Sequence, residues 1–217
     1  MNYNIIQSGS KGNAVIYDDK ILVDCGVSYH LLPKGIRYCL LTHEHGDHFK
    51  ADTIVKLYND GVKIIAGEWL EERLHRLGVK FIKSSYGKVL KSNQYTFSMV
   101  KLYHDVENCG WRIFVKDYKI LHATDTSHLR GIKAKDYDLY AIEHNYDEEE
   151  IQATIELKMA NKEFAYEKRV IETHLSIQQA ERFIEKNARK EHEVLKLHQH
   201  SKWKLKTCQK QIEKITY

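Results

Sequence analysis

The strongest constraint on the fold is the stretch CLLTHEHGDHFK, residues 39–50, where three histidines and one aspartate follow an apolar run. Such a run is typical of a buried strand, and loops at strand ends commonly carry functional side chains. Imidazole and carboxylate groups are the ligands that zinc, manganese or iron take in proteins. The HxHxDH spacing therefore predicts a metal site at the end of a buried strand.

Further histidine and aspartate residues follow later apolar segments. His104 follows FSMVKLY, Asp125 follows KILHAT and His174 follows RVIET, and we expect a strand before each of them. Strand ends at one edge of a sheet bring side chains that are distant in sequence to a common cleft. A lone histidine is more often structural than metal-binding, but the clustering of these residues favours a metal centre.

The HxHxDH loop has enough side chains for two ions. A tight loop can direct alternate residues in opposed directions, so that His43 and His45 serve one ion while Asp47 and His48 serve another. Asp125 could bridge two ions about 3.5–4 Å apart, the separation used by two-metal hydrolases. A hydroxide between the ions would be the nucleophile, and the cations would neutralise charge on a phosphoryl group.

Composition narrows the class of protein. The chain has 217 residues, of which 42% are hydrophobic, and we expect one α/β domain over residues 1–217. The net charge of +4 is too small to demand a nucleic-acid or membrane partner. The four cysteines form no C-x-x-C pair, no secretory signal opens the chain, and no apolar run approaches the roughly 20 residues of a membrane span. We therefore expect a cytoplasmic protein without membrane contact.

Hydrophobic periodicity predicts that strands and helices alternate along the chain. One helix is expected to begin at Ser176, where Gln179 completes a capping box. The expected strands cover residues 2–7, 14–18, 20–25, 36–42, 80–84, 95–104, 112–126 and 193–201, and the expected helices cover 51–61, 68–79, 148–168 and 176–188.

Five motifs, THEHGDH, YHD, ATDT, IEHNYD and THLS, resemble in this order the metallo-β-lactamase-fold hydrolases. With SGSKGNAVIY and ILVDCG near the N-terminus, the chain is most similar to the small bacterial exonucleases of the YycJ type and more distantly to ribonuclease Z. The resemblance covers residues 6 to about 201. It implies a four-layer αββα sandwich of two mixed β-sheets, with two divalent ions, zinc or manganese, at the strand ends.

The same resemblance assigns ligands residue by residue. It implies that Glu143, Asn145 and Asp147 support the site, while a threonine stands where the family usually has a glycine before His174. The first ion would be held by His43, His45 and His104, the second by Asp47, His48 and His174, with Asp125 as the bridge and Asp47 also counted as catalytic.

Other residues are candidates for contact with the substrate. His198, preferred over His200, would act as a general acid or hold a phosphate, although a histidine that merely caps a strand fits equally well. In the SGSKGN turn, Lys11 and Asn13 could meet a phosphate, but glycine and serine in a hairpin are usually turn chemistry alone.

The predicted function is a dinuclear-metal-dependent phosphodiester hydrolase, a nuclease acting on DNA or RNA. In IEHNYD, Tyr146 could stack on a base and His144 could contact the substrate. A cyclic-nucleotide phosphodiesterase is the first alternative, because the same chemistry serves any phosphodiester and the small charge offers no obvious track for a polymer. A catalytically silent metal-binding regulatory protein is the second. The resemblance also implies a homo-oligomer, in which residues 148–168 could contact a neighbour.

Overall fold

The computed structural model describes residues 1–199 and contains two six-stranded mixed sheets. The N-terminal sheet has antiparallel pairs from β1 to β3 and parallel pairs from β3 to β6. In the turn 18–20 between β2 and β3, Asp18 and Asp19 have left-handed φ values of 50° and 52°, a conformation that aspartate adopts more readily than most residues. In order across the sheet the strands are β1 (Tyr3–Gln7), β2 (Ala14–Tyr17), β3 (Ile21–Val23), β4 (Tyr38–Leu40), β5 (Lys63–Gly67) and β6 (Ile82–Ser84).

The second sheet has the same arrangement along the chain, with antiparallel pairs first and parallel pairs last. Its first four strands are antiparallel neighbours, and β10, β11 and β12 are parallel. In order across the sheet the strands are β7 (Val89–Ser92), β8 (Tyr95–Tyr103), β9 (Glu107–Val115), β10 (Tyr118–Ala123), β11 (Leu139–Glu143) and β12 (Glu193–Leu197).

The main core lies between the two sheets. Side chains alternate between the faces of a strand, so β2 directs Val15 and Tyr17 to this core and Ala14 and Ile16 to the opposite face. Both faces of β2 are buried, because helices cover the outer side of the sheet. Trp111 is the largest fully buried side chain of the core.

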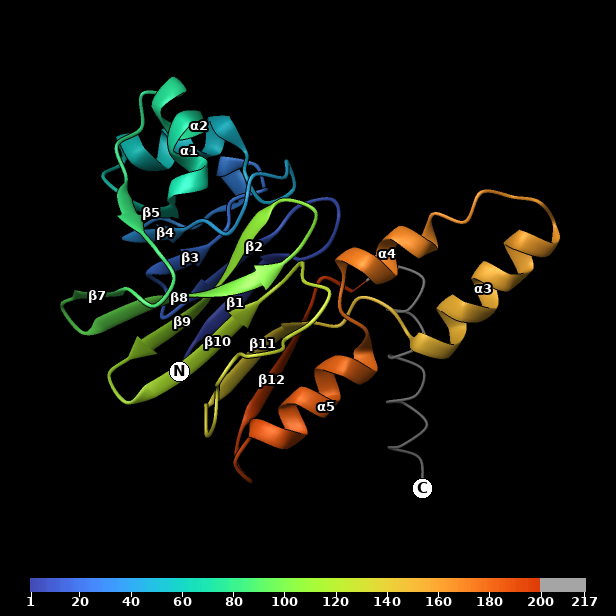
Figure 1. Cartoon of the computed structure of the whole chain (residues 1–217). Helices are drawn as coiled ribbons and strands as arrows, with labels where there is room; N and C mark the ends of the chain where they lie inside the picture. Colours follow the sequence, from blue (N-terminus) through green and yellow to red (C-terminus); the bar gives the residue numbers. More distant parts are fainter. Residues whose placement is uncertain (200–217) are drawn as a thin grey trace.

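Helices on both outer faces complete four layers (Figure 1). α1 (Ala51–Asn59) and α2 (Glu71–Arg76) pack on the first sheet, and α5 (Ile177–Asn187) packs on the second. Gly61 and Gly78 follow α1 and α2 as expected, and the capping box of Ser176 and Gln179 is present. The predicted αββα sandwich of mixed sheets is therefore confirmed.

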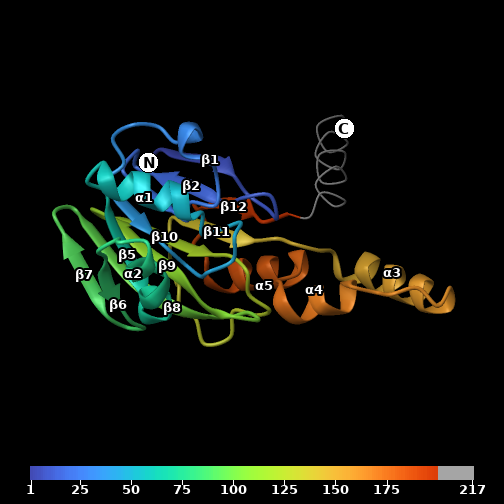
Figure 2. The same cartoon turned by 90° about the horizontal axis from the view of Figure 1, so that it is seen from above.

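The segment between β11 and α5 forms an arm, residues 148–173, that extends from the sandwich (Figure 2). The single helix expected here is two, α3 (Glu148–Ala160) and α4 (Glu167–Thr173). Lys162, with a left-handed φ of 58°, lies in the turn that follows α3. The arm has its own small apolar cluster, formed by Tyr146, Ile151, Ile155, Ala165 and Val170.

None of the helices in residues 1–199 is long and apolar enough to cross a bilayer.

Candidate dinuclear metal site

The candidate residues converge on one cleft of about 320 Å³. The HxHxDH loop follows β4, and His104, Asp125 and His198 follow β8, β10 and β12. The expectation of a strand before His174 is wrong, because residues 167–173 form α4 and His174 ends that helix. The cleft is lined by Ser10, His45, Asp47, His104, Asp105, Asp125, Tyr166, Arg169, Val170, Thr173, His174 and His198.

Among the described residues, four groups of potential metal ligands each have donor atoms within 4.8 Å of one another. One consists of His43, His45 and His104, a second of Asp47, His48 and His198, and a third of His43, His48 and Asp125. A fourth such group joins Asp125 and His198 to Glu143 and His174.

Asp125 lies between the first two groups. Its Oδ2 is 2.5 Å from Nε2 of His48 and 3.8 Å from Nε2 of His43, while its Oδ1 is 3.3 Å from Nε2 of His198. Nε2 of His43 is buried without a hydrogen-bond partner, while the buried oxygens of Asp125 and Nε2 of His198 form no hydrogen bond and meet neighbouring side chains only in ion pairs. Buried polar atoms without partners are unfavourable unless a ligand satisfies them, and this nitrogen and oxygen set fits divalent cations such as zinc or manganese.

Asp24, which the sequence analysis did not single out, orients two of these imidazoles. Nδ1 of His48 donates to Asp24 Oδ2 at 2.7 Å, so Nε2 faces Asp125. The Thr42 hydroxyl donates to the same carboxylate at 2.9 Å and accepts from Nδ1 of His43 at 3.0 Å. Hydrogen bonds of this kind fix the tautomer and the ring orientation of metal-binding histidines. The sequence feature that could have pointed to Asp24 is its position directly after the apolar strand ILV.

Asn13 holds the backbone of the HxHxDH loop rather than lining the cleft. Its backbone N–H donates to the carbonyl of Asp47 at 2.6 Å, and its side-chain amide reaches Asp47 Oδ2 at 3.2 Å and His48 Nε2 at 2.8 Å. Gly26 packs against the same loop so closely that a Cβ atom there would lie 1.7 Å from the carbonyl oxygen of Asp47. Any side chain at position 26 would therefore displace the loop.

Glu143 is fully buried and contacts both His174 and His198. Its Oε1 is 2.7 Å from Nδ1 of His174 and 3.3 Å from Nδ1 of His198, while its Oε2 accepts from the backbone N–H of Thr126 at 3.0 Å. The side-chain amide of Asn145 also contacts Nδ1 of His198, at 3.1 Å. These contacts turn Nε2 of His198 toward the metal ligands.

His104 is oriented from the arm, since its Nδ1 donates to the carbonyl oxygen of Thr173 at 2.8 Å. This carbonyl belongs to the last residue of α4, immediately before His174. Asn108, fully buried, donates to the carbonyl of Asp125 at 2.6 Å and supports its left-handed φ of 56°. Strained backbone of this kind is common at functional sites.

The sequence profile described as "Beta-lactamase superfamily domain" matches residues 19–198, which span most of the chain and all of the candidate ligands. The chain belongs to the metallo-β-lactamase superfamily. Among curated proteins, none matches it significantly.

Solved structures show the same fold at low identity. The metallo-β-lactamase-fold protein YhfI from Bacillus subtilis is 17% identical with a TM-score of 0.68 over 91% of this chain and 85% of its own. The short form of human tRNase Z is 15% identical with a TM-score of 0.62, covering 91% and 97%. A diphosphatase of the PhnP family is 16% identical with a TM-score of 0.64, covering 92% and 88%.

The electrostatics of this superfamily site are dominated by burial and by mutual interaction. Burial disfavours charge on Asp125, but His198 and His48 outweigh it and hold the pKa of Asp125 well below its usual range. Burial likewise opposes charge on His48, yet Asp125 and Asp24 raise its pKa to about 10. Burial and the neighbouring His48 lower the pKa of His43 well below normal. A metal ion that binds here must therefore displace a proton from His48.

His174 carries a firmly held proton. Burial opposes it, but Glu143 and Asp125 together raise the pKa of His174 to about 10. Its Nδ1 also lies 3.2 Å from Asp125 Oδ1. The ring lines the cleft and stacks on His198 with centroids 5.2 Å apart.

Several residues expected at the substrate lie elsewhere. His144 is fully buried on the outer face of the second sheet, and its Nδ1 donates to the carbonyl of Ile142. Tyr146 packs in the small cluster of the arm. Lys11 is exposed and does not line the cleft, whereas Ser10 of the same turn does. Asp147 caps α3, and His200 falls outside the described residues.

Proposed function

We propose that the chain is a dinuclear-metal-dependent phosphodiester hydrolase acting on nucleic acid. The observation that carries this proposal is the position of Asp125 between the two proposed ligand groups: its Oδ2 lies 3.8 Å from Nε2 of His43, and its Oδ1 lies 3.3 Å from Nε2 of His198. His43, His45 and His104 would hold one ion, and Asp125 would contact both. When bound, two divalent ions would supply the Lewis acidity that activates water and neutralises charge on a phosphoryl group.

The geometry favours an exchange of the roles that the sequence analysis gave to His174 and His198. His198 has its Nε2 3.7 Å from Asp47 Oδ2 and completes a ligand group with Asp47 and His48. We therefore assign His198, rather than His174, to the second ion. Glu143 and Asn145 orient this imidazole from the Nδ1 side.

His174 then serves as the proton donor to the leaving oxygen. Glu143 accepts from Nδ1 of His174 at 2.7 Å, which leaves the rest of the ring on the wall of the cleft. A carboxylate that binds one ring nitrogen fixes the tautomer and stabilises the imidazolium, so that the other nitrogen can exchange a proton with the substrate.

The choice of a phosphodiester rests on the superfamily and on the nature of the neighbours. One solved structure with the same fold is described as a tRNase Z and another as a diphosphatase, and both descriptions concern phosphate-containing substrates. This likeness supports the proposal by analogy of fold, while the ligand set supplies the chemistry.

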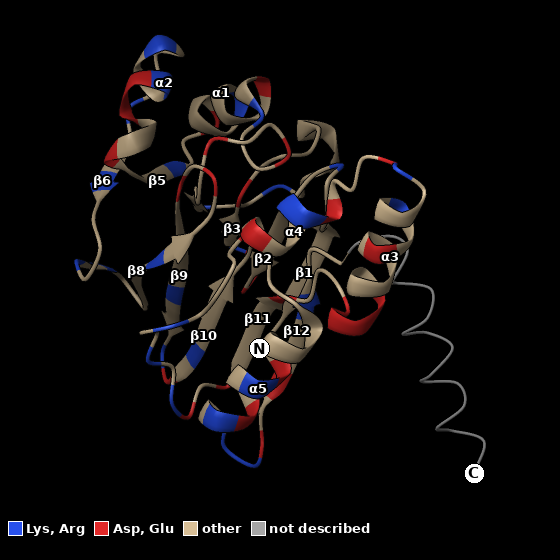
Figure 3. Cartoon of the chain, turned by 45° about the vertical axis from the view of Figure 1, so that its right-hand side comes forward, with Lys and Arg blue, Asp and Glu red and all other residues tan. Residues whose placement is uncertain are grey.

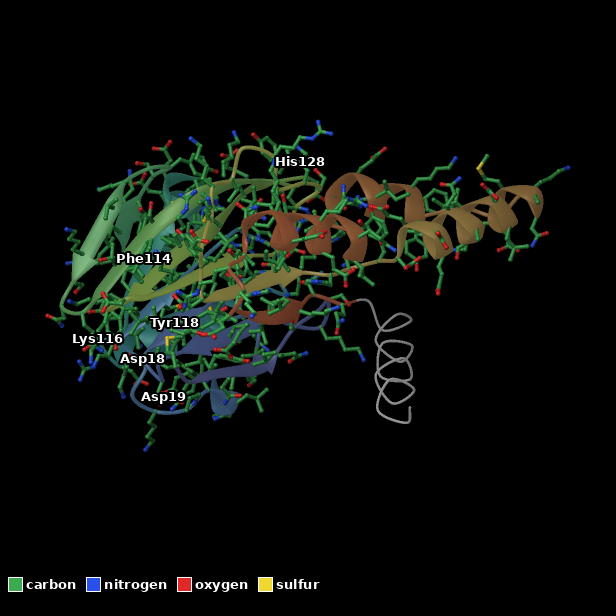
Figure 4. All side chains as sticks on the ribbon, turned by 90° about the horizontal axis from the view of Figure 1, so that it is seen from below. Asp18, Asp19, Phe114, Lys116, Tyr118 and His128 are labelled. Carbon is green, nitrogen blue, oxygen red and sulfur yellow. The ribbon has the colours of Figure 1, made fainter. Side chains whose placement is uncertain are left out.

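The test is cleavage of short DNA and RNA strands by the full chain with Mn²⁺ or Zn²⁺. We expect hydrolysis that Asp47→Ala abolishes and Asp117→Ala preserves. Asp117 is exposed on the turn after β9, next to Lys116; Figure 4 shows this turn beside Asp18, well apart from His128 near the arm. Full metal occupancy without hydrolysis of any phosphodiester would refute the proposal and favour a catalytically silent protein.

A cyclic-nucleotide phosphodiesterase is the second candidate. The volume of about 320 Å³ is at the lower end of the range of ligand pockets, which suits a small substrate. Turnover of cyclic mononucleotides in the absence of strand cleavage would select this function.

A further inference from the structure

One wall of the cleft comes from α4, in the arm, rather than from the sandwich. Tyr166, Arg169, Val170 and Thr173 line the cleft from this side, and Figure 3 shows the basic stretch on α4. Among the described residues that line the cleft, Arg169 carries the one fixed positive charge, and three aspartates line the same cleft. An anionic substrate that enters the cleft therefore meets this guanidinium.

Arg169 is held beside the first ligand group by Asp105. Its Nη2 donates to Asp105 Oδ2 at 2.5 Å, while the other oxygen of Asp105 lies 3.2 Å from Nε2 of His104 and 3.5 Å from Nε2 of His45. The Arg169 side chain is nevertheless 75% exposed, so most of its donors stay accessible. A guanidinium has five donors and binds phosphate oxygens in a fork-like geometry.

Tyr166 offers an aromatic surface next to this charge. The residue is 46% exposed although it lies at the cleft and at the start of α4. The Lys158 ammonium lies 4.4 Å from the centre of the ring and is also 2.6 Å from Glu167 Oε1, which holds the lysine in place. Partly exposed aromatic rings beside basic groups are platforms on which bases of single strands stack.

We propose that α4 selects single-stranded nucleic acid: Arg169 binds a phosphate that neighbours the scissile one, and Tyr166 stacks on an adjoining base. This inference rests on the proposed function and names its substrate class. A cyclic mononucleotide has no second phosphate for Arg169, so the same contacts disfavour it relative to a strand.

The first experiment measures binding rather than turnover. A fluorescein-labelled hexanucleotide with phosphorothioate linkages, which slow hydrolysis, is titrated with the full chain at several salt concentrations. Arg169→Ala should weaken affinity about tenfold and reduce the slope of log Kd against log salt by about 0.7, the value for one lost phosphate contact on a single strand. Arg76→Ala is the matched control, because Arg76 is also 75% exposed and paired with one carboxylate, that of Glu72 on α2.

A second experiment locates the contact on the strand. Single linkages of the hexanucleotide are replaced by uncharged methylphosphonates, one at a time. One replacement should weaken binding to the unaltered chain and to Arg76→Ala, but have no further effect on Arg169→Ala. Tyr166→Ala should weaken binding about tenfold, whereas Tyr166→Phe, which keeps the ring, should not.

Failure of this inference is distinguishable from failure of the proposed function. Hydrolysis of bis(4-nitrophenyl) phosphate by the unaltered chain tests the function alone, because this diester has no neighbouring phosphate. Equal affinity and equal salt slope for Arg169→Ala and the unaltered chain would overturn the role of α4, as would a complete lack of strand binding. Arg169-dependent binding without any hydrolysis would keep the role of α4 and refute the enzyme.

Discussion

The sandwich and the arm differ in how firmly they hold their residues. All proposed metal ligands come from the sandwich, where three apolar clusters pack between and outside the sheets. The arm has one small cluster and exposes Leu157, Met159 and Phe164, the last to 87%. Metal chemistry needs donor atoms fixed to a fraction of an ångström, whereas binding of a flexible strand does not. We therefore propose that the sandwich carries the chemistry and that the arm selects the substrate.

The largest expected effect concerns the division of roles between His198 and His174. His198→Ala should lose one of two bound ions and about a thousandfold in cleavage rate, since it removes a ligand. His174→Ala should keep both ions and lose about a hundredfold, because only proton transfer is affected. The measurements are the metal content of each variant, by inductively coupled plasma mass spectrometry, and its single-turnover cleavage rate. Loss of an ion from His174→Ala alone would reverse the assignment.

The next prediction compares the packing of the two regions. Ile142, fully buried on β11, packs in the cluster under α5, and Ile155 packs in the small cluster of the arm. Ile142→Ala should lower the free energy of unfolding by about 3 kcal/mol, and Ile155→Ala by about 1 kcal/mol, because the arm can close around the space that the lost side-chain carbons leave. Urea unfolding measures both values. Equal losses would show that the arm is held as rigidly as the sandwich.

The pH dependence of stability should also originate in the sandwich. His122 is buried on β10, where Nδ1 meets the hydroxyl of Tyr17 at 2.8 Å. Burial, followed by His48, lowers the pKa of His122 to about 3, against about 6.5 in an unfolded chain.

Below about pH 6.5 the unfolded chain therefore takes up a proton that the folded chain rejects, and stability falls as the pH falls toward 3. From pH 7.5 to 5 this loss should be about 2 kcal/mol. His122→Gln should remove that share of the dependence in urea unfolding, while a substitution of the exposed His192 should not. An unchanged pH profile for His122→Gln would contradict the buried neutral imidazole.

The smallest effect is expected at Phe164. Phe164→Ser should change the free energy of unfolding by less than about 0.5 kcal/mol, because the ring has few packing partners to lose. Thermal unfolding at several protein concentrations checks this. A concentration-dependent loss of stability would instead indicate that a neighbouring copy covers the ring, as the predicted homo-oligomer requires.

Much of the fold followed from patterns within short segments. The HxHxDH loop, the strand periodicity and the Ser176 capping box each depend on residues close in sequence, and each is present as expected. The prediction of a strand before His174 failed because RVIET has apolar residues that suit either a strand or a short helix. Val170 packs into the cluster of the arm, and that long-range contact decided the outcome.

The roles of individual site residues were less accessible. Asp24 and His48 meet because the segment after β3 pairs with the HxHxDH loop, with Cys25 opposite Phe49. The local sequence around Asp24 and around His48 does not indicate that these two side chains are in contact. The same limit applies to His198 and Asn13, since spacing places a residue at a sheet edge but does not determine which ring nitrogen or amide faces the proposed metal site.

The hydrogen bond from His104 to the carbonyl of Thr173 ties the proton position on a proposed metal ligand to the last turn of the arm. Exchanging the arm for that of another superfamily member would thus alter the first ion site unless the donor segment ends with a carbonyl in the same place. A graft whose last junction follows Thr173 would keep this anchor only if its final residue placed its backbone carbonyl at the same position, whereas a graft whose last junction precedes Val170 would leave the Thr173 carbonyl in place.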